Sequence, residues 1–107
     1  MVRNEYMREW IRNLENEYIH FGDYDLAGIH IYLNEIVPRL KKSKKYSMFI
    51  PENIEYLIEE YGNLEIFRDQ NGKYNNLIIN DIEINKLHNI ISNKKKGLEQ
   101  EGLYKFV

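Results

Sequence analysis

Two aspartates one residue apart, Asp23 and Asp25, have the types and spacing best suited to chemistry in this sequence. They follow the β-favouring run "YIHF" and precede a segment with helical spacing of its apolar residues. In an extended backbone, residues two apart point to the same side at a spacing of about 7 Å, so both carboxylates can face one point. Mg²⁺ takes hard oxygen ligands, often only one or two carboxylates, and completes its shell with water and substrate phosphate. The pair therefore predicts a Mg²⁺ site, in which Mn²⁺ would be a substitute.

The same residues are also typical of a structural turn. Aspartate is favoured at helix N-caps and in turns, and Asp25 directly precedes a helix predicted to begin at Leu26. A capping role needs no metal, and the two roles are compatible. Gly22 and Gly28 lie on either side of the pair. Because glycine has no Cβ, backbone or ligand can approach closely at both positions.

The composition is that of one globular domain. The chain has 107 residues, of which 43% are hydrophobic and 30% charged, enough apolar material for a single core. No window approaches the about 20 apolar residues of a membrane span. The absence of cysteine excludes disulfides, thiolate nucleophiles and zinc-thiolate sites. With no apolar leader segment behind Met1, we expect a cytoplasmic location.

The net charge of −2 argues against a domain that coats nucleic acid by charge alone. Two local clusters are nevertheless basic. Lys94, Lys95 and Lys96 form one, and a run without an acid forms the other, with cations at Arg39, Lys41, Lys42, Lys44 and Lys45. They predict a basic rim that could contact a nucleic-acid backbone. The alternative is that both clusters are solvated loops or helix C-termini, where the helix dipole favours cations.

The acidic pair is expected to lie between a strand and a helix. Apolar residues at helical spacing predict a first helix over residues 4–16. Residues 18–22 then read as a short strand buried on both faces. The helix beginning at Leu26 should end near Val37, because Pro38 disfavours helical geometry in the residue before it.

The remainder continues the alternation of strands and helices. "YSMFIP" predicts a second strand, and the apolar spacing from Ile54 predicts a helix that ends at Gly62. Residues 63–77 contain an Asn-Gly pair that favours a small hairpin or a loop. Asn80 and Glu83 resemble a capping box that starts a last helix, and the tail could add one short helical turn. This order predicts one α/β domain over residues 1–107 with a mainly parallel sheet.

Two segments carry a resemblance to a known family. "GDYDLAGIHIYLNEIVPRL" resembles the D-x-D segment of Toprim domains, particularly the form GD-x-D-x-x-G-x-x-I of type IIB topoisomerase A subunits and their meiotic relative. "KKGLEQEGLY" is similar to the LEQE element near the C-terminus of JetD, the DNA-cleaving subunit of Wadjet-type plasmid-defence systems, and its relatives. Two elements in the same order, about 75 residues apart, are more specific than either alone.

The resemblance implies a Toprim-like, Rossmann-like α/β fold with flanking helices, bound Mg²⁺ and cleavage of the DNA backbone. Asp23 and Asp25 match the acidic pair of the family, and Glu99 and Glu101 match the two glutamates of the late element, either of which could approach the metal. Gly22 and Gly28 match the glycines that shape the turn. The basic run would contact DNA, and subunits of an SMC-like defence complex would be further partners.

One departure from the family pattern is large. Toprim domains carry a glutamate at the end of an earlier strand, whereas the residues that precede the first strand here are predicted to be helical. We therefore expect the chain to be the C-terminal part of a longer protein, inactive by itself and able to pair its exposed strand edge in a homodimer.

The alternative to a DNA-cleaving fragment is a non-enzymatic Toprim-like or receiver-like α/β module for assembly or regulation. The sequence shows no nucleophile–base pair and no phosphate-binding glycine loop, so it gives no support for a small-molecule enzyme. Only the first interpretation predicts that Glu99 or Glu101 lies beside Asp23 and Asp25.

Overall fold

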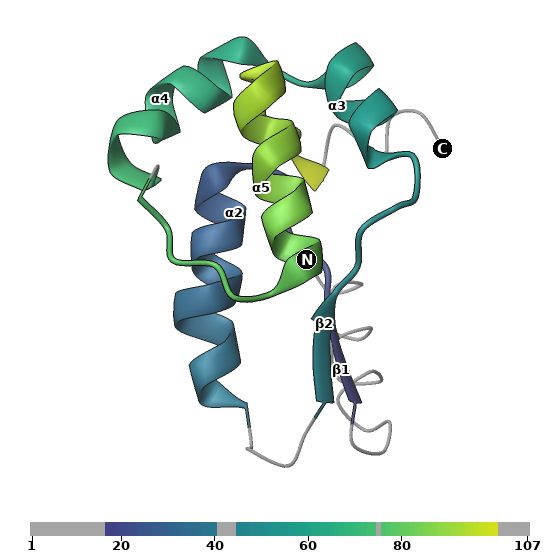
Figure 1. Ribbon diagram of the computed structural model, residues 1–107, viewed down its shortest axis with the longest axis vertical. Coiled ribbons are helices and arrows are strands. Elements are labelled where there is room, and N and C mark those ends of the chain that lie inside the picture. The colour runs from purple at the N-terminus through teal and green to yellow at the C-terminus, as the bar shows by residue number, and fades with distance from the viewer. Residues whose placement is uncertain (1–16, 41–44, 75, 101–107) are drawn as a thin grey trace.

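The computed structural model describes residues 17–40, 45–74 and 76–100. They form a mixed α/β domain in which a small two-stranded parallel sheet is flanked by helices (Figure 1). The α/β class predicted from the alternation of elements is confirmed, and two strands are compatible with an incomplete α/β fold. The helix predicted over residues 4–16 and the helical turn predicted for the tail lie outside the described residues.

The two strands are β1 (Glu17–His20) and β2 (Lys45–Met48). They pair in parallel, with Tyr18 opposite Tyr46 and His20 opposite Met48. Parallel strands need a crossover connection, which a helix usually supplies. Here the helical segment that follows the acidic turn supplies it, as the predicted order of strand, turn and helix requires.

The crossover is one continuous helical stretch. It begins as α2 (Leu26–Ile31) and continues through a π-helical turn (Tyr32–Ile36) into a 3₁₀ turn (Val37–Arg39). The predicted end near Val37 is therefore two residues early. Pro38 is accommodated because it falls in the first positions of the 3₁₀ turn, where its missing N–H is not needed.

Helices α3 (Ile54–Tyr61) and α5 (Ile82–Lys94) agree with the predicted apolar spacing. The end of α3 at Gly62 is confirmed. The Asn80–Glu83 capping box is wrong by one position. Asp81 is the N-cap of α5, and its Oδ1 accepts from the backbone N–H groups of Glu83 and Ile84 at 2.9 and 3.1 Å.

The hairpin or loop predicted within residues 63–77 is wrong, because the segment forms helix α4 (Leu64–Tyr74). Asn63 starts it: its Oδ1 accepts from the N–H groups of Glu65 and Ile66 at 2.7 and 3.3 Å. The Asn-Gly pair lies inside the helix, where Gly72 faces open space. A glycine in a helix costs only about 1 kcal/mol, which packing of α4 against α2 outweighs.

The core lies among the helices, and Met48 at the end of β2 adds to it. Helix α5 packs on α2 and α3, and α4 packs on α2 (Figure 1). The buried cluster contains no residue of α4. Its members are Tyr24, Leu26, Ile29, Tyr32, Met48, Ile54, Ile58, Ile84, Leu87, Ile91 and Leu98. Within the described residues, no helix has the length and apolar character to cross a membrane.

Candidate functional site

The acidic turn (Asp23–Asp25) follows β1 and is hydrogen-bonded to the residue that follows β2. The N–H of Phe49 donates to the carbonyl of His20 at 2.8 Å, which extends the strand pairing by one bond. Tyr24, between the two aspartates, is buried, and its hydroxyl donates to the carbonyl of Phe49 at 2.8 Å. Because side chains alternate along extended backbone, the aspartates lie on the side away from Tyr24.

Asp25 is a buried helix cap with only 4% of its surface exposed. Its Oδ1 accepts from the N–H of Gly28 at 2.6 Å, and its Oδ2 accepts from Nε2 of Gln70 at 3.2 Å. The other end of the same amide, Oε1 of Gln70, accepts from the N–H of Ala27 at 3.0 Å. The structural role predicted as an alternative for Asp25 is therefore confirmed. Both of its oxygens are engaged by α2 and α4.

Gly28 is required for the tightness of this turn. A Cβ at this position would lie 2.2 Å from the carbonyl oxygen of Asp23 and 3.0 Å from Oδ1 of Asp25. At Gly22 the nearest atom to an added Cβ is Nε2 of His20 at 2.7 Å, which belongs to a side chain and not to the backbone. Of the two predicted turn glycines, Gly28 is thus the one that fixes the geometry of the acidic pair.

The late segment, residues 97–100, lies directly against the acidic turn (the short yellow element beside α5 in Figure 1). Leu98 forms an antiparallel bridge with Tyr24 through two backbone hydrogen bonds of 2.8 and 2.9 Å. Gly97 forms a second bridge with Asn63, at the start of α4. The N–H of Gln100 then donates to Oδ1 of Asp23 at 2.7 Å. Segments far apart in the sequence are thereby joined around the aspartates.

Close packing accompanies these hydrogen bonds. A Cβ on Gly97 would lie 2.8 Å from Cβ of Asp25 and 2.7 Å from Cγ2 of Ile66. The late segment therefore fits between the acidic turn and α4 only because residue 97 is glycine.

Two neighbouring carboxylates act on the charge of Asp25. Burial raises the pKa of Asp25 above its ordinary value of 3.8, and the charges of Asp23 and Glu99 raise it further. The hydrogen bonds from Gly28 and Gln70 act in the opposite direction on the same pKa. Among the described residues, no lysine or arginine forms an ion pair with Asp25. The cluster has a local negative charge that a bound cation would neutralise.

The donor atoms suit Mg²⁺ in kind, although the described residues do not form a complete ligand set. Residues 17–40, 45–74 and 76–100 contain no group of three His, Asp or Glu side chains placed to hold a metal ion. Mg²⁺ commonly binds through one or two carboxylates and several waters. Asp23 is half-buried and Glu99 is exposed, so these two carboxylates fit such a site, whereas the oxygens of Asp25 are already used.

The predicted basic run is not adjacent to the acidic turn. Arg39 ends the crossover and Lys45 begins β2, at the end of the strands opposite to the acidic turn, and both are exposed. The other predicted cations of this run and one predicted glutamate lie outside the described residues: Lys41, Lys42, Lys44 and Glu101. The structure thus brings together Asp23, Asp25 and Glu99 and separates them from Arg39 and Lys45.

Gln70 and Asn63 belong to the site and were not predicted from the sequence. Gln70 holds Asp25 in place, and Asn63 caps α4 and pairs with the late segment. An assignment of α4 as a helix would have placed Gln70 and Ile66 on one face, four residues apart. Because the Asn-Gly pair favoured a hairpin or a loop, this shared helical face was not predicted.

These features define a class: an α/β domain with an acidic turn at the carboxyl end of a parallel strand, closed by a segment from the end of the chain. The chain belongs to the family described as Domain of unknown function (DUF7281), which matches residues 3–105. Comparisons with curated proteins and with solved structures gave no match. Membership of this family assigns no activity to the chain.

Proposed function

We propose that this chain carries the acidic site of a Toprim-type enzyme that cleaves the DNA backbone with Mg²⁺. The observation that supports the proposal is the contact between residues 97–100 and the acidic turn. These are the two segments that resemble Toprim and JetD sequences, and they meet in space although about 75 residues separate them.

In this proposal the three carboxylates have different tasks. Asp23 and Glu99 would hold the ion, which when bound would neutralise charge on the scissile phosphate. Asp25 is a positioning residue: through Gly28 and Gln70 it fixes the turn that presents Asp23. The N–H of Gln100 holds Oδ1 of Asp23 and leaves Oδ2 as the oxygen available to a ligand. DNA is the expected partner.

A second candidate is a non-enzymatic α/β module for assembly or regulation. The burial of Asp25 and the use of both its oxygens favour it, because they account for this aspartate without any ligand. In that case Asp23 would serve only to hold the late segment through the N–H of Gln100.

Thermal unfolding with and without Mg²⁺ separates the two candidates. A ligand that binds only the folded state adds about 1.4 kcal/mol to the free energy of unfolding at ten times its Kd. We expect the Tm of the wild type to rise with Mg²⁺ concentration, and this rise to disappear in Asp23→Asn and in Glu99→Gln. Asparagine keeps an oxygen that accepts from the N–H of Gln100, so the first variant should remain folded.

Glu83→Gln is the matched control, because Glu83 is an exposed glutamate at the start of α5. It should keep the full Mg²⁺ response. A wild type with a cooperative transition that is independent of Mg²⁺ would favour the non-enzymatic module.

A further inference from the structure

The two faces of the sheet have different surroundings. Side chains alternate between the faces of a strand, so Tyr18 and His20 share one face and Ile19 lies on the other. The first face, called the inner face below, meets the crossover. The ring of His20 stacks on that of Tyr32 at 5.2 Å, and Met48, opposite His20, belongs to the buried core. Helix α2 lies on this side of the strands (Figure 1).

The other face, called the outer face, carries apolar side chains that have no part in this core. They are Ile19 and, just beyond the ends of the two strands, Phe21 and Phe49. The two phenyl rings stack at a centroid distance of 5.4 Å, and Phe49 is 46% exposed. None of the three belongs to the buried cluster or to the hydrophobic residues packed against it. Because parallel sheets are normally covered on both faces, the outer face should have a partner.

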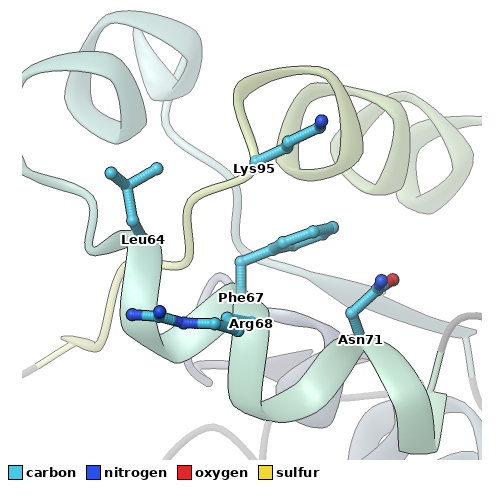
Figure 2. A pocket seen from close by; sticks show the side chains of 5 residues that line it. All are labelled: Leu64, Phe67, Arg68, Asn71 and Lys95. Carbon is cyan, nitrogen blue, oxygen red and sulfur yellow. The ribbon is translucent and has the colours of Figure 1, made fainter.

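A second apolar surface is the pocket between α4 and the end of α5 (Figure 2). Leu64 and Phe67 provide its apolar wall, and the charged ends of Arg68 and Lys95 point to different sides. The described residues give no indication of an occupant for this pocket. The outer face differs, because the chain enters it from a segment with a matching apolar pattern.

That segment is residues 1–16, which lie outside the described part of the chain. It ends where β1 begins, at Glu17. Four of its apolar residues are spaced as on one face of a helix: Met7, Trp10, Ile11 and Leu14. A helix over residues 4–16 would measure about 20 Å, which is longer than either strand. The segment is therefore long enough to cover the outer face.

The short connection decides which face the segment can reach. Two residues separate Leu14, the last apolar residue of the helical pattern, from Glu17. A connection this short places a helix beside the strand that follows it, running in the opposite direction. The crossover already covers the inner face, so the outer face is the one that remains. In this orientation Trp10 lies about two residues further along β1 than Leu14 does.

We propose that residues 4–16 form a helix that covers the outer face of the sheet, with Trp10 against Ile19. Burial of the two apolar surfaces would drive the packing. The cover would also support the acidic turn, because the backbone of Phe49 is hydrogen-bonded to His20 and to the hydroxyl of Tyr24. The proposal requires neither metal binding nor cleavage of DNA.

Trp10 is the only tryptophan of the chain, so its fluorescence reports on the segment without a label. In the full chain we expect the emission of a buried indole and weak quenching by acrylamide. Ile19→Thr keeps a β-branched side chain in β1 and makes the outer face polar. It should shift the emission of Trp10 to longer wavelength and increase quenching, while the far-UV circular dichroism stays unchanged.

Ile31→Thr is the matched control. Ile31 is 43% exposed, but it belongs to α2, on the other side of the strands. The same substitution there should leave the emission of Trp10 unchanged.

Nuclear Overhauser effects identify the occupant of the outer face directly. We expect them between the indole of Trp10 and the methyl groups of Ile19 within one molecule. The proposal is overturned if Trp10 emits as a water-exposed indole in the wild type, or if Ile31→Thr shifts the emission as much as Ile19→Thr. It is also overturned if these Overhauser effects appear only between molecules in a mixture of labelled and unlabelled chains, which would make the outer face a contact between two copies.

Discussion

Replacement of Gly28 by alanine is expected to lower the free energy of unfolding by about 3 kcal/mol. The new Cβ would lie 2.2 Å from the carbonyl oxygen of Asp23, far inside van der Waals contact. That oxygen belongs to the backbone, so relief requires the acidic turn to move away from α2. The movement would break the hydrogen bond between Asp25 and the N–H of Gly28 and shift Asp23 from the N–H of Gln100. Chemical denaturation measures the loss.

Gly72→Ala is the control for this substitution. Gly72 is also helical, but an added Cβ meets no atom within 4 Å. Alanine is a better helix former than glycine, so this variant should gain about 0.5 to 1 kcal/mol. Equal and small effects at the two glycines would mean that the acidic turn is not packed as described.

Asp25→Asn is expected to cost about 2 kcal/mol, although it changes a single oxygen into an amide nitrogen. Asparagine can keep the acceptor for the N–H of Gly28, but its Nδ2 would then face Nε2 of Gln70, donor against donor. Rotation of Gln70 gives no relief, because its Oε1 accepts from the N–H of Ala27. Gln70→Glu should also be destabilising, since it places a second carboxylate against Asp25.

The double variant Asp25→Asn/Gln70→Glu should recover most of the lost stability. Its glutamate would accept from both the N–H of Ala27 and the new amide at position 25, so every hydrogen bond of the wild type has an equivalent. A double-mutant cycle at equilibrium measures this coupling. Additive losses from the two substitutions would contradict the described pairing of Asp25 with Gln70.

The cost of Asp25→Asn should depend on pH. Because the pKa of Asp25 is raised in the folded state, the folded chain holds this proton more tightly than the unfolded chain does. The stability that comes from this group is therefore complete below its ordinary pKa of 3.8 and decreases as the pH rises through the raised value. The difference between the wild type and Asp25→Asn should accordingly be larger in acid than at neutral pH.

Local patterns were sufficient to predict most of the described elements. The strands, the crossover helix and the helices α3 and α5 follow from apolar spacing and from breakers such as Gly62, which act within a few residues. Helix α4 was missed because its Asn-Gly pair has the composition of a turn, while the interactions that keep it helical come from α2. The capping residue of α5 was misplaced by one, since Asn80 and Asp81 are both good caps.

The site was predictable only in part. Asp23 and Asp25 stand out by type and spacing, and the cap at Asp25 follows from its position before α2. The late segment reaches them through backbone groups of Tyr24, Leu98 and Gln100, and backbone hydrogen bonds leave no signature in the residue types. Its placement was expected from the family resemblance and not from the chemistry of its residues. Gln70 has no sequence signal of its own.

The different tasks of the aspartates change how the pair should be tested. A variant that removes both carboxylates would disturb the turn through Asp25 and the metal candidate through Asp23, and so would confuse folding with binding. Asp23→Asn with Glu99→Gln changes only the two carboxylates that are accessible. The cap at Asp25 stays intact in this variant.

The central claim is that Asp23 and Glu99 form one metal-binding edge on the acidic turn. Mn²⁺ titration followed by residue-resolved NMR tests it most directly, because paramagnetic broadening reports distance from the ion. We predict broadening centred on residues 23 and 99 of the wild type at low Mn²⁺, and its loss in Asp23→Asn/Glu99→Gln with an otherwise unchanged spectrum. Broadening that is absent from the wild type, or that is spread evenly over its exposed carboxylates, would contradict the claim.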